Sequence, residues 1–313
     1  MDGTFQLALR LIADGLVMGF IYALMAIGLT LIFSVLGLVN FAHGEFYMIG
    51  GYVAWFLVTK FINMPPLLAV PLAGLATFII GAVFDYLLLQ PMHKGEIERP
   101  QEYAILITFG WAFILQYLTL AIVGPWPQKT PRYFDLPTLD LGTLKLTGAM
   151  MKAGFIPISA TRLTAALISV ILLVILVYFM NYTWTGKALR AVSEDKQAAA
   201  TVGINPRRMS TLAFGLGTML AGMAGAALVP AFAWVPQVGV PATTKTFVIM
   251  VLGGMGSMPG AMIGGLIIGV VEALGAGLIP DAIRAYAYRD AYGLIIFALV
   301  LLLRPTGLFG RKS

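Results

Sequence analysis

Long stretches without a charged residue constrain this chain more than any other feature of its sequence. About eight of them divide the 313 residues, at 15–44, 46–59, 61–84, 103–128, 163–186, 209–244, 246–271 and 291–303. A helix needs about 20 apolar residues to cross a bilayer. Only 11% of the residues are charged, against about a quarter in soluble domains. The sequence therefore predicts an all-α integral membrane protein, with one transmembrane domain over residues 1–313.

Lys and Arg in short loops predict which side of the membrane each loop occupies. Basic residues gather in 186–208, in the loop 91–102 and at the C-terminus, so we expect all three on the cytoplasmic side. The loop 124–162 holds five basic residues too, but long loops are translocated with little regard to charge. We expect this loop outside, where its prolines favour irregular or short-strand structure.

Glycine and proline interrupt two of the apolar stretches. With the loops placed as above, the stretch 246–271 begins and ends outside, so it cannot be one simple span. The run Gly-Gly-Met-Gly-Ser-Met-Pro-Gly at 253–260 lies at its centre and predicts two half-helices joined by a turn. A similar glycine-bearing interruption occupies 37–45. Irregular backbone at membrane depth needs protein or a water-lined cavity around it, so both interruptions are expected to be re-entrant.

The residues of these two interruptions are the candidates for a translocation path. They are Asn40, His43, Gly44, Glu45, Gly253, Gly254, Gly256 and Ser257. Ionisable groups inside a membrane are functional candidates, and half-helix N-termini could offer N–H groups to a carboxylate. The structural alternative is that the same polar groups cap the broken helices. A local pair of His43 with Glu45 is a further possibility.

The segment 186–208 is the one strongly polar segment between apolar stretches in the second half of the chain. Ser193 is a suitable N-cap, and Glu194 and Asp195 would lie in the first turn against the positive helix end. Gly203 suits the helix end. The pattern predicts a short helix from Ser193 to Gly203 on the inner side. It could rest on lipid headgroups or dock into a protein groove, and its small side chains, Ala199 among them, favour docking.

Three segments resemble the permease subunits of branched-chain amino acid ABC importers. The run Gly-Lys-Ala-Leu-Arg-Ala-Val-Ser-Glu-Asp from 186 resembles the cytoplasmic loop of that family. The run Gly-Leu-Val-Asn-Phe-Ala-His-Gly-Glu-Phe-Tyr-Met at 37–48 resembles its N-terminal signature, and 253–260 matches a third feature. The motifs stand in the family's order, and the likeness extends to 304–310. The chain resembles the first of two related permease subunits.

The resemblance implies the rest of a transport machine in a bacterial inner (plasma) membrane. A second permease subunit would complete the path, two cytoplasmic ATPase subunits would drive it, and an external binding protein would deliver the substrate. The substrates implied are leucine, isoleucine and valine, although similar permeases serve urea, amides or aromatic acids. The chain has no Gly-x-x-x-x-Gly-Lys-Ser/Thr phosphate loop. The energy for transport would therefore come from the ATPase subunits. It would reach this chain through the coupling residues Arg190, Ser193, Glu194, Asp195, Ala199 and Gly203.

Two other protein classes remain as alternatives. An ion- or proton-coupled secondary transporter of small organic solutes would need an acidic residue at the bundle centre. Asp14, Asp85 and Glu272 adjoin apolar stretches, but the expected topology places each near an interface. A membrane enzyme would need a catalytic cluster, and the chain has no cysteine and only two histidines, in different segments. We therefore expect no catalytic residue, metal site or cofactor, and no nucleic-acid partner.

Overall fold

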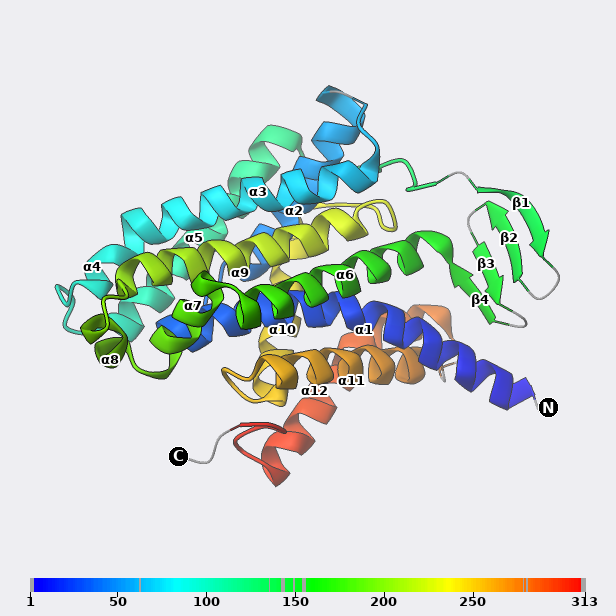
Figure 1. Ribbon diagram of the computed structural model, residues 1–313. Coiled ribbons are helices and arrows are strands. Elements are labelled where there is room, and N and C mark those ends of the chain that lie inside the picture. The colour runs from blue at the N-terminus through cyan, green and yellow to red at the C-terminus, as the bar shows by residue number, and fades with distance from the viewer. Residues whose placement is uncertain are drawn as a thin grey trace.

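The computed structural model describes residues 3–61, 63–134, 136–141, 144–148, 150–153, 156–277, 279 and 281–310. Most of its long helices lie along a common axis (Figure 1). We call the end with α7 (Trp184–Glu194) and α8 (Lys196–Thr201) the coupling-loop end. The opposite end, which carries four strands, is the sheet end.

The helices account for the apolar stretches of the sequence. The long ones are α1 (Gly3–Leu36), α3 (Pro66–Phe84), α5 (Pro100–Val123), α6 (Ala160–Tyr182), α9 (Pro206–Leu228), α11 (Met258–Gly277) and α12 (Ala282–Leu303). The shorter ones are α2 (His43–Phe56), α4 (Gln90–His93) and α10 (Gly239–Gly253). Single turns of other helix types occur at Leu57–Phe61, Asp85–Leu89 and Pro236–Val238. Within the described residues, six helices are long and apolar enough to cross a membrane. The prediction of a helical multi-pass membrane protein is confirmed.

The loop between α5 and α6 contains a small antiparallel sheet. Its strands are β1 (Leu136–Leu141), β2 (Leu144–Gly148), β3 (Met150–Ala153) and β4 (Ile156–Ser159), paired in chain order. The short strands expected in 124–162 are therefore present. Because β4 ends where α6 begins, the sheet lies at one end of the bundle, near the start of α1 (Figure 1).

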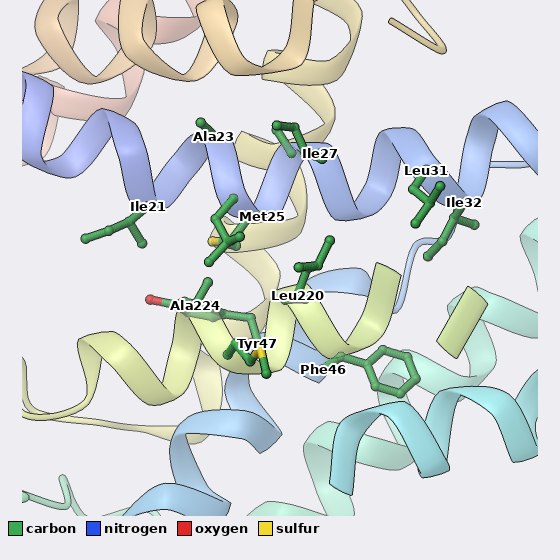
Figure 2. Close-up of a cluster of buried hydrophobic side chains, with 14 of the residues drawn as sticks. Ile21, Ala23, Met25, Ile27, Leu31, Ile32, Phe46, Tyr47, Leu220 and Ala224 are labelled. Carbon is green, nitrogen blue, oxygen red and sulfur yellow. The ribbon is translucent and has the colours of Figure 1, made fainter. Parts of the chain in front are cut away.

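Small residues let the central helices touch along their backbones, as membrane helices often do. A Cβ built on Gly217 of α9 would lie 2.5 Å from the carbonyl oxygen of Gly28 in α1. A Cβ on Gly50 of α2 would collide with the backbone of Gly222, also in α9. Between these contacts, apolar side chains of α1, α2 and α9 fill the core, with Ile21, Met25, Phe46 and Leu220 among those in Figure 2.

The first interruption carries the chain back into the bundle. Helix α1 ends at Leu36, and Gly37 has a φ of 76°, which suits glycine. Helix α2 begins at His43, whose Nε2 lies 3.0 Å from the Met25 carbonyl oxygen. At 1.5 Å per residue, Met25 lies about 16 Å along α1 from its end. Residues 37–42 therefore re-enter the bundle, and the predicted interruption near 37–45 is confirmed.

The interruption at 253–260 is present, but it joins a short helix to a long one instead of two half-helices. Helix α10 ends at Gly253 and α11 begins at Met258, so a turn separates them as expected. The turn lies at the coupling-loop end, where Phe309 N–H of the C-terminal segment donates to the Gly253 carbonyl (3.0 Å). Helix α11 has 20 residues and is long enough to span. Only α10 is short, so the turn does not join two half-helices at the membrane centre.

A second re-entry, which the sequence interpretation missed, explains this difference. The uncharged stretch 209–244 holds α9 and the start of α10, with an irregular return between them. In that return, Trp234 Nε1 donates to the Met48 carbonyl of α2 (3.0 Å). Helix α10 then begins beside α2, where Gly44 N–H donates to Thr243 Oγ1 (2.9 Å).

The two re-entries give the fold an inverted arrangement. Helix α1 runs toward the coupling-loop end and α9 runs away from it (Figure 1). Each is followed by a re-entrant segment, a short helix that begins inside the bundle, and a long helix. Transporters often use such inverted repeats, with interrupted helices meeting between them. The matched interruptions are 37–42 and 229–238, and both short helices begin at their meeting point.

Candidate functional site

The structure brings the first group of path candidates together and separates them from the second. Asn40, His43 and Glu45 are at most 1% exposed and lie where α2 begins, beside α10. Residues 253–257 lie at the coupling-loop end, against the C-terminal segment. The two groups therefore do not form one cluster.

The backbone donors at the start of α2 are already bonded within the chain. Ala42 N–H donates to Asn40 Oδ1 (3.0 Å) and His43 N–H to the Asn40 carbonyl (3.2 Å). Gly44 N–H bonds Thr243, as above, and Glu45 N–H donates to the Ala42 carbonyl (3.0 Å). The geometry therefore favours the capping alternative here over a carboxylate site on open N–H groups.

Three polar atoms at this junction are buried without a hydrogen-bond partner among the described residues. They are Asn40 Nδ2, His43 Nδ1 and Glu45 Oε2. His43 bonds the Met25 carbonyl through its other nitrogen, so the structure shows no pairing of Nδ1 with Glu45. The Glu45 carboxylate packs against Gly239, where any Cβ would collide with it. A buried polar group without a partner is costly, so this junction is a site of functional interest.

The residues of the second group shape a tight turn. Gly254 and Gly256 have φ values of 103° and 85°, which non-glycine residues rarely adopt. Gly253 packs backbone to backbone against Gly260, and Ser257 Oγ accepts from Gly260 N–H (3.1 Å). Ser257 is thus a cap for α11. A bulky side chain at 253 or 254 would disrupt this packing. Loss of uptake in such a variant would therefore not distinguish a transport defect from a folding defect.

The coupling segment is folded differently from the prediction. It consists of two helices, and Ser193 is not an N-cap but lies in the last turn of α7, where its Oγ donates to the Arg190 carbonyl (2.7 Å). Asp195 caps α8 instead, accepting from Gln197 N–H (2.7 Å) and Ala198 N–H (3.0 Å). The physical reason is that Asp195 has an extended backbone and satisfies two orphan donors at once.

The exposed side chains of this segment differ from those expected. Arg190, Glu194 and Asp195 are exposed, whereas Ala199 is only 3% exposed and packs within the chain. Val202 is 75% exposed and presents an apolar side chain at the end of α8. Gly203 has a φ of 87° and follows the end of α8, as predicted.

Helix α8 also contacts the start of the first re-entry. Lys196 Nζ donates to the Leu36 carbonyl at the end of α1 (3.3 Å). A hollow of about 370 Å³ lies here, with Gly37, Gln101 and Arg207 in its wall. The segment 186–208 therefore touches the element that leads to the buried junction.

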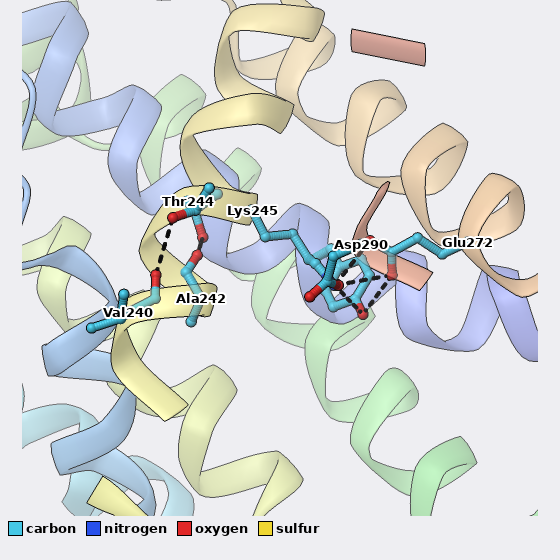
Figure 3. Close-up of polar contacts among 8 residues, drawn as sticks. Val240, Ala242, Thr244, Lys245, Glu272 and Asp290 are labelled. Atoms are coloured by element: carbon cyan, nitrogen blue, oxygen red, sulfur yellow. Dashed lines mark hydrogen bonds and ion pairs between the residues drawn. The ribbon is translucent and has the colours of Figure 1, made fainter. Parts of the chain in front are cut away.

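The sequence interpretation missed a charged cluster inside the bundle. Lys245 of α10 lies 2.9 Å from Glu272 of α11 and 2.9 Å from Asp290 of α12 (Figure 3). Tyr22 of α1 donates its hydroxyl to Glu272 (3.1 Å). Glu272 is 1% exposed and lies five residues before the end of α11 at Gly277. The sequence does mark Lys245, because it is the single charged residue between the uncharged stretches 209–244 and 246–271.

Comparison with known proteins identifies the family. The family model for the permease component of branched-chain amino acid transport systems matches residues 11–304. The chain belongs to this family. It is 34% identical to the high-affinity branched-chain amino acid transport system permease protein BraD of Pseudomonas aeruginosa, over 97% of this chain and 96% of the relative. It is 31% identical to LivH of Escherichia coli K12, over 100% of this chain and 99% of the relative.

A second kind of permease protein is also similar. LivM of Escherichia coli K12, from the same type of transport system, is 25% identical over 92% of this chain and 67% of its own length. No solved structure matches the chain. The family membership agrees with the resemblance read from the three sequence motifs.

Proposed function

We propose that this chain is a permease subunit of an ATP-driven importer for branched-chain amino acids. The observation that carries the proposal is its similarity along nearly the whole length to BraD and LivH, both named as permeases of high-affinity branched-chain amino acid systems. The inverted arrangement of spans around two short helices supports a transport role.

The proposed partners are a second permease subunit, ATPase subunits at one end of the bundle and a binding protein at the other. The similarity to LivM supports a second, related permease subunit. ATPase subunits dock at the coupling-loop end on α7 and α8, with the exposed Arg190, Glu194, Asp195 and Val202 as the contact residues. The binding protein meets the sheet end, at the loop 124–162. The proposal includes a cytoplasmic C-terminus and a bundle in the inner membrane of a bacterial cell.

The path runs past the junction of α2 and α10. Asn40, His43 and Glu45 support this as buried polar groups in an apolar bundle. Residues 253–257 lie at the cytoplasmic mouth. The ATPase stroke reaches the junction through Lys196 and the end of α1.

One observation favours the alternative, a proton-coupled transporter. Glu45 is a buried acid whose Oε2 has no hydrogen-bond partner among the described residues, which is the mark that such a mechanism needs. The proposed importer must therefore be separated from this alternative by its energy source.

A pull-down tests the proposed coupling surface. The tagged chain is purified in mild detergent from its host membranes, and co-purifying ATPase subunits are quantified. We expect Val202→Asp to lose them, because it places a charge in an apolar contact. Trp126→Asp is the matched control, since Trp126 lies near the sheet end and is also 75% exposed. Retention of ATPase subunits by Val202→Asp, or their loss in both variants, would contradict the surface.

A further inference from the structure

A hollow of about 230 Å³ lies between α10, α11 and α12. One part of its wall is charged and is formed by Lys245, Glu272 and Asp290. Another part is aliphatic and includes Val248, Ile268 and Leu294. Both kinds of wall thus face the same space.

The two carboxylates around Lys245 differ in exposure. Its Nζ lies 2.9 Å from Glu272 Oε1 and 2.9 Å from Asp290 Oδ1. The Glu272 side chain is 1% exposed and also accepts from the Tyr22 hydroxyl, whereas the Asp290 side chain is 63% exposed. Asp290 is therefore the carboxylate that a ligand in the hollow can reach, and the Lys245 ammonium is in contact with it (Figure 3).

We infer that the cluster lies inside the hydrocarbon layer, taking the coupling-loop ends of α1, α11 and α12 as one edge of that layer. Tyr22, Glu272 and Asp290 each lie about 20 Å along their own helices from the coupling-loop end, at 1.5 Å per residue. The layer is about 30 Å thick. An exposed carboxylate facing lipid at that depth is costly, and such groups face the bundle interior or a water-filled cavity. This face of α10 and α12 therefore meets water or protein in the assembled membrane protein.

We propose that the hollow binds a zwitterionic aliphatic amino acid on its way across the membrane. Asp290 accepts the ligand's ammonium group, Lys245 donates to its carboxylate, and the wall of Val248, Ile268 and Leu294 holds its side chain. This inference rests on the proposed function and adds the residues that recognise the substrate.

The chemistry of the cluster suits this ligand class. Binding replaces one ion pair by two. The Lys245–Asp290 contact is lost, and Lys245 then pairs with the carboxylate of the ligand while Asp290 pairs with its ammonium group. The buried Glu272 remains beside Lys245 and keeps the ammonium in place. An amine or a carboxylic acid alone would satisfy only one of the two groups and leave the other without its partner in a low-dielectric site.

Single cysteines test the proposal, because the chain has none of its own. Leu294→Cys places a thiol in the wall of the hollow, and Ile295→Cys places one on the neighbouring residue of α12, which is 54% exposed and lines no part of the hollow. Thr244→Cys, on the α10 side, is a second reporter. Each full-length chain is expressed with its partners, and its reaction with N-ethylmaleimide is timed in intact cells. The thiolate is the reactive form, so labelling requires water at the thiol.

We expect Leu294→Cys and Thr244→Cys to react at least tenfold faster than Ile295→Cys. Leucine at saturating concentration should slow both reporters severalfold during transport and leave Ile295→Cys unchanged. Protection should disappear when Asp290→Asn is combined with Leu294→Cys. It should persist when Leu294→Cys is combined with Glu102→Gln, which removes a carboxylate from an exposed ion pair elsewhere (3.3 Å to Arg99).

Uptake of labelled leucine by the same cells distinguishes failure of the proposed binding site from failure of the proposed function. Uptake without protection, or protection that survives Asp290→Asn, would overturn the binding site while the proposed function stands. If the parent chain imports no leucine, the proposed function itself fails. Slow labelling of both reporters would show that the hollow is closed by lipid or protein, which also overturns the proposal.

Discussion

Gly50 sets how closely α2 can approach α9, since any Cβ there would collide with the backbone of Gly222. We expect Gly50→Ala to lower the stability of the folded chain by about 1–3 kcal/mol, the usual cost of overpacking. The thermal midpoint in detergent measures this.

Gly110→Ala is the control for that variant. A Cβ on Gly110 of α5 meets no atom within 4 Å, so the substitution should be neutral or stabilising by up to about 1 kcal/mol, because alanine favours helix. Equal midpoints for the two variants would contradict the backbone contact between α2 and α9.

Asp195 is both an N-cap and a charged residue, and two substitutions test these properties separately. Asp195→Asn keeps an N-cap and should leave α8 intact, whereas Asp195→Ala should cost about 0.5–2 kcal/mol of local stability. Protease cleavage rates within 196–203 of the purified chain report this difference. If both variants are cleaved at the parent rate, the cap does not stabilise α8.

The site residues could be predicted from the sequence only in part. Asn40, His43 and Glu45 could be singled out from the sequence because they are polar residues beside apolar stretches, and the structure buries all three; their role in a path stays a prediction. Ser193 was placed wrongly, because the serine and Asp195 are both good N-caps and sequence alone does not rank them. Lys245 and Glu272 were missed as partners, because only tertiary packing brings residues of α10 and α11 together.

Between helices, the buried charges hold α10 against α11. Lys245→Met removes the cation beside Glu272 and should destabilise the chain by about 3–5 kcal/mol. The double variant Lys245→Met, Glu272→Leu should recover most of that loss, because no buried charge is left unpaired between those two residues. Thermal midpoints of the single and double variants give the comparison.

The control is Arg99→Met, which breaks an exposed ion pair with Glu102. It should cost at most about 1 kcal/mol. A double variant no more stable than Lys245→Met would show that the loss does not come from removing the cation beside Glu272.

The long helices could be predicted from uncharged stretches, but the re-entries could not be placed reliably. Charges mark the ends of α3, α5 and α6, so those helices were identified. The return at 229–238 carries no charge, and only Pro230 and Pro236 mark it within an uninterrupted apolar stretch. Without it, the topology required two half-helices around the turn at 253–260, where the structure has a short helix and a long one.

Across the whole molecule, the start of α1 and the C-terminal segment lie at opposite ends of the bundle (Figure 1). Phe5 belongs to the first and Phe309 to the second. Both side chains are about half exposed, at 53% and 49%. A membrane-impermeant maleimide should therefore label Phe5→Cys in intact cells and Phe309→Cys only after permeabilisation. Labelling of both from the same side would contradict the arrangement of spans.

The energy source distinguishes the permease of an ATP-driven importer from an ion-coupled transporter. The chain is reconstituted in proteoliposomes with its co-purifying partners, and uptake of labelled leucine is measured with ATP inside, with ADP inside, and with a proton or sodium gradient alone. We predict uptake that requires ATP and persists when an ionophore removes the ion gradients. Uptake driven by an ion gradient without ATP would contradict the proposed function, and would make the buried Glu45 the first residue to study.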